Sequence, residues 1–400
     1  MLSVAEGQAI VLEHTRPLPG QLVPLPAALG LVLAEDVASD IDSPPYDKSL
    51  MDGYAVRSAD TASGQAALRI IEEVTAGRVP EQTVGPGQAT RIMTGAPIPQ
   101  GADTVVPVER TRMLESNQVQ IETVPKPGQN ILRRAQEMAR GQTVLPAGTV
   151  IRPQVIGLLA SVGRTAVKAH PQPIVAVLPT GDELVEAPEM PGPGQIRNGN
   201  GPMLVAQIAR AGGMPQYLGI ARDRLDHLRT LVGEGVKAPV LVLSGGVSAG
   251  KLDLVPGVLQ ELGVRAHFHK VEMKPGKPIF FGTGAEGTLV FGLPGNPVSS
   301  LVCFELFVRP AMRRLLGHTE PGPRMVPLPL AEDFAYASDR PTYYPARVEA
   351  GPSGWLVRPG PWFGSADLRA LAPTNALVLF PPGDHRHRAG QLLPVLVTGD

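Results

Sequence analysis

The sequence has little cysteine and little net charge, and it contains no long hydrophobic run. Cys303 is the one cysteine among 400 residues, which excludes an internal disulfide and favours a reducing compartment. A formal net charge of −1 provides no basic field for nucleic acid. No apolar run reaches the roughly 18 residues that a membrane-spanning helix needs. We therefore expect a cytoplasmic protein that binds neither nucleic acid nor a membrane.

Two familiar catalytic signals are also missing. Cys303 lies in the apolar stretch LVCFELF, which is typical of a buried structural thiol rather than a nucleophile. The chain has no Walker phosphate loop, and GTGAEG at 282–287 matches the dinucleotide fingerprint without a helix after it. We therefore interpret GTGAEG as a hairpin turn.

Glycine and proline are abundant instead, with 45 and 43 residues spread along the chain, as in a multidomain protein with many tight turns. Residues 1–40 and 141–170 contain helical patterns and predict a helical linker domain. Short alternating segments within 41–140 predict an inserted β-module. Residues 171–318 predict a mostly parallel α/β domain with helices on both faces, and 319–400 a C-terminal, β-barrel-like domain. The expected fold class is thus multidomain α/β plus β.

Four glycine-rich segments follow predicted strands of the α/β domain, where the ligands of such sheets bind. In the first, PTGDEL at 179–184, the side chains of Asp182 and Glu183 either cap a helix or coordinate a hard cation such as Mg²⁺. Asn198 and Asn200 follow in the next loop and offer polar contacts or helix caps. Both interpretations stay open at this point.

The second segment, LSGGVSAGKLD at 243–253, combines three glycines with Ser244 and Ser248. Consecutive backbone N–H groups in such a turn form an anion-binding nest. Asp253 either caps the following helix or binds a metal ion. This amount of glycine and serine favours a functional loop over a plain strand-to-helix turn.

The last two segments are KPGKP at 274–278 and GLPGNPVSS at 292–300. The prolines restrict the first segment and hold Lys274 and Lys277 close together, which indicates an anion beside them, although lysines also occupy ordinary solvated turns. The second segment leads into a long helix whose first N–H groups favour a phosphate. Together the four segments indicate a site for a large anionic ligand and a metal ion.

Two further segments stand out in the β-module. SPPYDKSLMDGYAV at 43–56 contains Asp52, and RIMTGAPIPQGADTVVPVE at 91–109 contains Thr94. An ordinary β-strand would not need so many polar, turn-forming residues beside bulky side chains, which favours a functional segment. A plain loop would explain the same residues, and spacing alone does not decide between the two.

These six segments, in this order, resemble the molybdopterin molybdenumtransferase family of molybdenum-cofactor biosynthesis, to which the C-terminal catalytic region of gephyrin belongs. The resemblance covers nearly the whole chain. It implies that molybdate is inserted into adenylylated molybdopterin with Mg²⁺, so that AMP is released and molybdenum cofactor forms. It also implies a homodimer with four domains per subunit and a contact with a molybdopterin adenylyltransferase.

The resemblance further implies which residues act. The implied catalytic residues are Asp52, Thr94, Glu183, Asp223, Asp253, Lys274 and Lys277. From the residues themselves we expect Asp182, Glu183 and Asp253 to hold Mg²⁺. The resemblance adds Pro294, Pro297, Arg347 and Ser365 as substrate-binding residues, and from the glycine-rich segments themselves we expect Thr180, Gly181, Ser244, Gly245, Gly246, Ser248, Gly295 and Asn296 to bind the substrate. One departure is Glu137, which replaces the family's usual aspartate in RRAQEMARG.

Two other functions compete with this interpretation. A molybdopterin adenylyltransferase shares the SGG and PGNP segments but does not need the β-module or the C-terminal domain. A non-enzymatic scaffold would not need Asp52, Glu183, Asp253 and the two KPGKP lysines. The presence of all these features favours the transferase.

Overall fold

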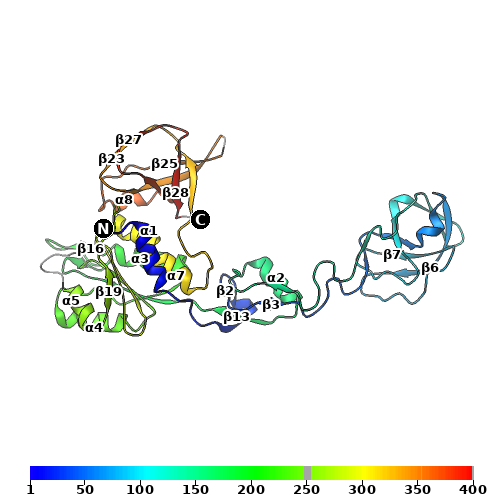
Figure 1. Cartoon of the computed structure of the whole chain (residues 1–400), viewed down its shortest axis with the longest axis horizontal. Coiled ribbons are helices and arrows are strands. Elements are labelled where there is room, and N and C mark those ends of the chain that lie inside the picture. Colours follow the sequence, from blue (N-terminus) through cyan, green and yellow to red (C-terminus); the bar gives the residue numbers. More distant parts are fainter. Residues whose placement is uncertain (247–253, 353, 399–400) are drawn as a thin grey trace. The chain divides into compact units, whose positions relative to one another are not determined.

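The computed structural model describes residues 1–246, 254–352 and 354–398, which form two compact units (Figure 1). The larger unit comprises Met1–Ala34, Gly148–Arg152 and Ala166–Asp400, and the smaller one comprises Glu35–Ala147 and Pro153–Thr165. Within the described ranges, no helix is both long enough and apolar enough to span a membrane. Of the predicted site residues, Ser248 and Asp253 lie outside the described residues.

A six-stranded sheet forms the centre of the larger unit, in the order β17-β14-β18-β21-β20-β19. The first four strands are parallel to one another, and the last two are antiparallel to their neighbours. β20 and β21 are joined by the GTGAEG segment, which confirms the predicted hairpin turn. The strands are β14 (Ile174–Pro179), β17 (Met214–Tyr217), β18 (Val240–Ser244), β19 (Arg265–Phe268), β20 (Phe280–Thr283) and β21 (Leu289–Leu293).

Helices cover both faces of this sheet, as the sequence predicts, because successive side chains of a strand point to opposite faces. Val175 and Val177 of β14 belong to a core shared with α1, α3, α6 and α7, whereas Ala176 and Leu178 pack with α4 and α5. The helices are α1 (Val4–Glu13), α3 (Asn200–Arg210), α4 (Leu225–Gly235), α5 (Val255–Glu261), α6 (Pro297–Cys303), the π-helix η4 (Phe304–Val308) and α7 (Arg309–Leu315).

Two local predictions in this domain are settled by the structure. Cys303 is fully buried in the core, and burial raises the pKa of its thiol, which confirms the structural role. The sequence QYLGIA, 216–221, predicts a strand there, but the strand lies earlier in the chain, since β17 ends at Tyr217. Leu218, Gly219 and Ile220 follow β17 without regular structure.

The predicted helical linker in 1–40 and 141–170 is wrong over most of its length. Its helices are α1, α2 (Pro153–Ser161) and the short η1 (Leu25–Ala27), and Val11 of α1 belongs to the core of the α/β domain. The rest consists of short strands and irregular segments, and Gln21 pairs with Ala169 across a long stretch of sequence. These strands are β1 (Gln21–Pro24), β2 (Val32–Leu33), β3 (Val37–Ala38), β12 (Thr143–Leu145) and β13 (Ala166–His170).

The smaller unit contains a six-stranded sheet in the order β8-β5-β7-β6-β10-β9. Every residue of β5 is buried, and Tyr54 and Val56 pack in one core while Ala55 packs in another. The strands are β4 (Lys48–Ser49), β5 (Gly53–Val56), β6 (Ala66–Val74), β7 (Gln88–Ile92), β8 (Thr104–Pro107), β9 (Thr111–Leu114), β10 (Gln118–Ile121) and β11 (Ile131–Leu132).

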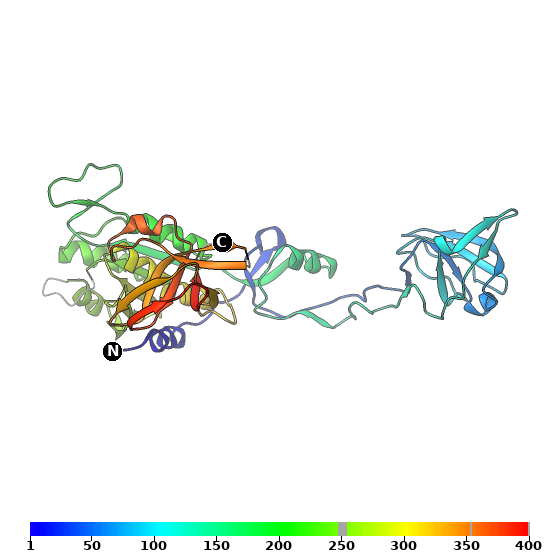
Figure 2. The same ribbon diagram turned by 90° about the horizontal axis from the view of Figure 1, so that it is seen from above.

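The C-terminal residues of the larger unit form a five-stranded antiparallel sheet, β22-β28-β26-β24-β25, and a two-stranded sheet, β23-β27. Tyr343, Leu377 and Leu396 belong to the same core as α6 and α7, so these strands (orange to red) pack against the α/β domain (Figure 2). The elements are β22 (Met325–Pro329), β23 (Phe334–Ser338), β24 (Thr342–Gly351), β25 (Gly354–Pro359), α8 (Leu368–Leu371), β26 (Ala376–Phe380), β27 (Gly383–His387) and β28 (Leu392–Val397).

Candidate active site

A pocket of about 560 Å³ lies at the carboxyl ends of β14, β18 and β21, where three of the predicted glycine-rich segments meet. We call it the polar pocket. It contains nine of the predicted site residues, namely Thr180, Glu183, Ser244, Gly245, Gly246, Pro294, Gly295, Asn296 and Pro297. Its position agrees with the rule that ligands of open α/β sheets bind beyond the carboxyl ends of the strands.

Thr180 lines this pocket just beyond β14. The side chain is buried, and its hydroxyl has no hydrogen-bond partner among the described residues. Gly245 and Gly246 both have positive φ, and a Cβ atom at Gly246 would lie 2.7 Å from the Thr180 Oγ1 atom. Buried polar groups are nearly always paired, so an orphaned hydroxyl facing a glycine loop is suited to a polar ligand atom.

Asn200 joins the loops that follow β18 and β21. Its Nδ2 atom donates to the Ser244 hydroxyl and to the carbonyl oxygen of Gly295, each at 2.8 Å. Asn198 has a different role, because its Oδ1 atom accepts from the Gly201 N–H and holds the first turn of α3. The predicted polar contact therefore fits Asn200, and the predicted cap fits Asn198.

Asp182 and Glu183 precede β15 (Leu184–Val185), which pairs with β16 (Ile196–Arg197), so they do not begin a helix and the capping interpretation is wrong. The Asp182 carboxylate instead accepts from the backbone N–H of Asp223 at 3.1 Å. Glu183 folds back over Gly181, where any Cβ atom would collide with its carboxylate. Asp182, Asp223 and Gly181 thus support the turn that presents Glu183 to the pocket.

The carboxylates of this turn fit a metal ion only in part. Among the described residues, no group of three or more His, Cys, Asp or Glu side chains is arranged to hold a metal ion. Mg²⁺ commonly takes one or two carboxylates and completes its shell with water and substrate phosphate. Glu183 at the pocket wall suits that arrangement.

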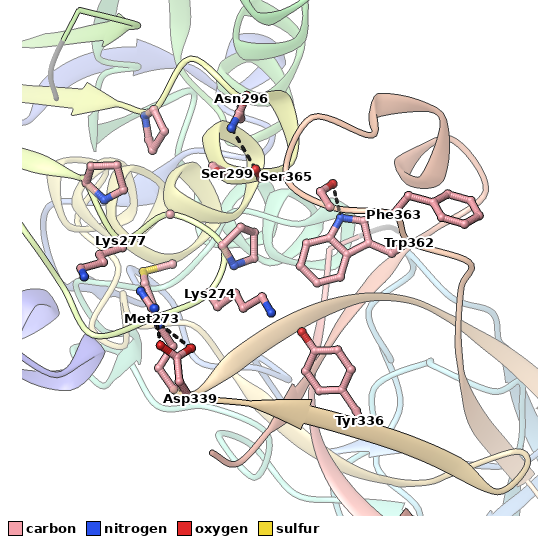
Figure 3. A pocket seen from close by; sticks show the side chains of 16 residues that line it. Met273, Lys274, Lys277, Asn296, Ser299, Tyr336, Asp339, Trp362, Phe363 and Ser365 are labelled. Atoms are coloured by element: carbon pink, nitrogen blue, oxygen red, sulfur yellow. Dashed lines mark hydrogen bonds and ion pairs between the residues drawn. The ribbon is translucent and has the colours of Figure 1, made fainter. Parts of the chain in front are cut away.

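A second pocket, of about 540 Å³, adjoins the first and shares Pro278, Pro294 and Asn296 with it. We call it the lysine pocket. Lys274 and Lys277 line it from the α/β domain, and Tyr336, Trp362 and Phe363 line it from the C-terminal domain (Figure 3). Both lysines of the predicted Pro-Gly turn line this cavity, and their side chains extend in different directions (Figure 3).

Aromatic and charged side chains of the C-terminal domain complete the lysine pocket. The Lys274 ammonium lies 5.4 Å from the centre of the Tyr336 ring, within the range of a cation–π contact. Asp339 and Arg340 also line the pocket and form an ion pair, and this pairing lowers the pKa of Asp339. The sequence analysis did not identify Tyr336, Asp339, Arg340 and Trp362 as site residues. For Trp362 a signal was available, because this tryptophan, one of two in the chain, lies between two glycines in GPWFGS.

Ser365 lines the lysine pocket, whereas Arg347 does not. The Ser365 hydroxyl accepts from Asn296 Nδ2 at 2.8 Å, and its carbonyl accepts from the Val298 N–H. Arg347 is an exposed residue of β24 and lies among the lining residues of neither pocket described here. Its side chain points to solvent because alternate residues of β24 face the buried core.

The remaining predicted pair, Asp52 and Thr94, lies in the smaller unit. The backbone N–H and the hydroxyl of Thr94 both donate to Asp52 Oδ1, at 2.7 and 2.8 Å. These two bonds, the backbone one first, lower the pKa of Asp52. The divergent Glu137 lies in the same unit and accepts a hydrogen bond from the Ser43 hydroxyl at 2.7 Å.

The comparisons with known proteins cover the whole chain. Residues 2–163 match the MoeA N-terminal region (domain I and II), residues 176–314 a probable molybdopterin binding domain, and residues 327–398 the MoeA C-terminal region (domain IV). The chain is 35% identical to a molybdopterin molybdenumtransferase of Staphylococcus aureus, over 99% of this chain and 96% of that one.

Two further relatives agree. The molybdopterin molybdenumtransferase of Bacillus subtilis is 36% identical, over 94% of this chain and 89% of its own. The crystal structure of a molybdopterin biosynthesis MoeA protein from Pyrococcus horikosii superimposes with a TM-score of 0.83 at 30% identity and covers all of both chains. The chain belongs to the molybdopterin molybdenumtransferase (MoeA) family.

Proposed function

We propose that this protein inserts molybdate into adenylylated molybdopterin in the presence of Mg²⁺, so that AMP is released and molybdenum cofactor forms. The observation that carries the proposal is the pair of adjoining pockets, one polar and one lined by two lysines, that share Pro294 and Asn296. A substrate with a pterin, phosphates and a nucleoside needs a long site of this mixed character. The names of the full-length relatives support the same reaction.

In this proposal the polar pocket holds the phosphates of the substrate. The glycine loop after β18 presents backbone near Thr180, and Asn200 holds the loops after β18 and β21 together. The Thr180 hydroxyl, which has no hydrogen-bond partner among the described residues, would then donate to a phosphate oxygen. Glu183, together with Asp182 behind it, would hold Mg²⁺ against the phosphates. The ion supplies Lewis-acid stabilisation of a phosphoryl oxygen when it is bound.

The lysine pocket holds the anion that is inserted. Two ammonium groups beside one cavity repel each other, and a molybdate dianion between Lys274 and Lys277 would neutralise both. Tyr336 and Trp362 form an aromatic wall beside Lys274 (Figure 3). The site therefore works through positioning and charge neutralisation, which are the main contributions that a protein makes to such a transfer.

The proposal includes a homodimer and a contact with a molybdopterin adenylyltransferase. Asp52 is kept ionised by Thr94 and has no cation paired with it among the described residues. We propose that this aspartate serves the site of the partner subunit. A size-exclusion and light-scattering measurement that gives a monomer mass at working concentration would contradict this part of the proposal.

A reconstitution experiment tests the function as a whole. The purified protein is incubated with adenylylated molybdopterin, Mg²⁺ and molybdate, and the mixture is then added to a cofactor-free molybdoenzyme. We expect the molybdoenzyme to gain activity, and we expect Glu183→Gln to abolish this gain. Glu234→Gln is the control, because Glu234 is an exposed partner of Lys237. Equal gains with wild type and with Glu183→Gln would contradict the proposed site.

A further inference from the structure

A third cavity, of about 100 Å³, lies on the larger unit away from both pockets of the proposed site, and none of its lining residues lines either of them. Arg309 and Arg313 line it from successive turns of α7, and Glu305 lines it from the π-helix η4. Arg324, at the start of the C-terminal domain, and Val397, at the end of β28, complete it. We call it the arginine pocket.

The one carboxylate of this pocket is already fully used. The Glu305 side chain is completely buried, and its Oε1 atom accepts from Arg210 at 2.5 Å and from Gln207 at 3.0 Å. Its Oε2 atom accepts from Arg309 at 2.8 Å. Two guanidinium groups therefore already share a single negative charge before the other arginines are considered.

Arg313 and Arg324 add positive charge that the pocket does not balance. Neither forms an ion pair in the part of the chain that the structure describes, although the exposed Glu320 lies near Arg313 and gives its backbone carbonyl to the guanidinium at 3.0 Å. The Arg313 Nε–H is buried without a hydrogen-bond partner. Burial, and then repulsion from Arg309, lower the pKa of Arg313. Burial, and then the charge of Arg313, lower the pKa of His318.

We propose that the arginine pocket binds one tetrahedral oxyanion, of the size of inorganic phosphate. Guanidinium groups are the side chains that best match the geometry of such anions. The cavity, at about 100 Å³, is the smallest of the three and is large enough for one such oxyanion. A bound anion would supply the missing partner of Arg313 Nε and would link α7 to Arg324 of the C-terminal domain.

Calorimetric titration with inorganic phosphate tests this proposal, in a Lys274→Ala, Lys277→Ala background that removes the lysines of the other site. We expect one phosphate per chain to bind in a manner that depends on Arg324, apart from phosphate bound in the polar pocket. Arg324→Ser should weaken it about tenfold or more, because a charged hydrogen bond is lost. Arg324 is exposed, so this variant should fold even if Arg313→Gln does not. Arg386→Ser, at an exposed position of β27, is the matched control and should bind like the background.

A second measurement locates the anion and a third identifies its source. Crystals soaked in selenate should show an anomalous peak within hydrogen-bond distance of the Arg313 guanidinium. Competition by AMP would assign the site to a terminal phosphate group, and phosphate binding without competition would assign it to a free oxyanion. Equal phosphate affinities in Arg324→Ser, Arg386→Ser and the background, or selenate peaks only in the polar and lysine pockets, would overturn the proposal. No substrate turnover enters these measurements, so they are independent of the proposed function.

Discussion

The guanidinium of Arg222 donates a 2.7 Å hydrogen bond to the carbonyl oxygen of Leu184 from its Nη1 atom. The same nitrogen also approaches the carbonyl oxygens of Gly181 and Asp182, at 3.3 and 3.2 Å. One side chain therefore ties together the turn that carries Glu183. Arg222 acts as a positioning residue in our account, because it holds this turn without lining the polar pocket.

Replacing Arg222 by Met should lower kcat for AMP release by about 10-fold to 100-fold and leave KM much less changed. The loss corresponds to one or two charged hydrogen bonds that hold Glu183 in place. Arg222→Lys should recover part of the rate, since it restores a charged donor. Arg224→Met is the control, because Arg224 pairs with the exposed Asp226. A change in KM alone would contradict a positioning role.

Gly246→Ala should destabilise the larger unit by about 1–3 kcal/mol, because Gly246 has φ +62° and its new Cβ would meet Thr180 Oγ1 at 2.7 Å and Val255 Cγ2 at 2.9 Å. Gly257→Ala is a matched control within α5, where a Cβ meets no atom within 4 Å. It should stabilise by about 0.4–1 kcal/mol, because the unfolded chain loses freedom. Urea unfolding measures both, and equal stabilities would show that the loop tolerates a side chain.

Thr94→Val should raise the pKa of Asp52 toward its ordinary value. The substitution removes the hydroxyl donor at 2.8 Å and leaves the backbone N–H donor in place, so the rise should be partial. A carbon-13 NMR titration of the Asp52 carboxyl measures it. Thr111→Val removes a hydroxyl that binds only the Val108 carbonyl and should leave Asp52 unchanged. An unshifted titration in Thr94→Val would show that the hydroxyl bond does not form in solution.

His318 should make stability fall as the pH is lowered from about 6.5 to about 4. Burial and the charge of Arg313 lower the pKa of His318 to about 4, so the unfolded chain takes up a proton in this range and the folded chain does not. Because the side chain is only half-buried, we expect a contribution of about 1–2 kcal/mol.

Comparison of wild type with His318→Asn isolates this contribution, since the other histidines are common to both chains. His318→Asn should lose less stability than wild type between pH 6.5 and 4 in urea unfolding. His269→Asn, at an exposed position, is the control and should follow the wild-type curve. Parallel curves for wild type and His318→Asn would contradict the prediction.

The residues of the polar pocket are predictable from sequence because they follow strands of one parallel sheet. PTGDEL, SGG and PGNP end β14, β18 and β21, and parallel strands bring their carboxyl ends to one edge. Lys274 and Lys277 are predictable for a local reason, since the turn between them is short and restricted. Local pattern and sheet topology were sufficient for these residues.

The aromatic wall and the linker depend on long-range contacts that no local pattern contains. Trp362 and Tyr336 reach the lysine pocket because the C-terminal sheet packs on α6. The local sequence around these two residues does not predict that packing. Residues 21–24 look compatible with several structures until their partner strand, 166–169, is known. Arg222 has no local signal at all, since its acceptors lie about 40 residues earlier in the chain.

Molybdate-dependent AMP release in a single turnover tests the central claim most directly. Adenylylated molybdopterin is held in the presence of Mg²⁺ with and without molybdate, and free AMP is measured over time for wild type, Lys274→Ala and Lys277→Ala. Our account predicts that AMP release depends on molybdate in wild type, and that either lysine variant needs a higher molybdate concentration. AMP release that is equal with and without molybdate, or a molybdate dependence that neither lysine changes, would contradict it.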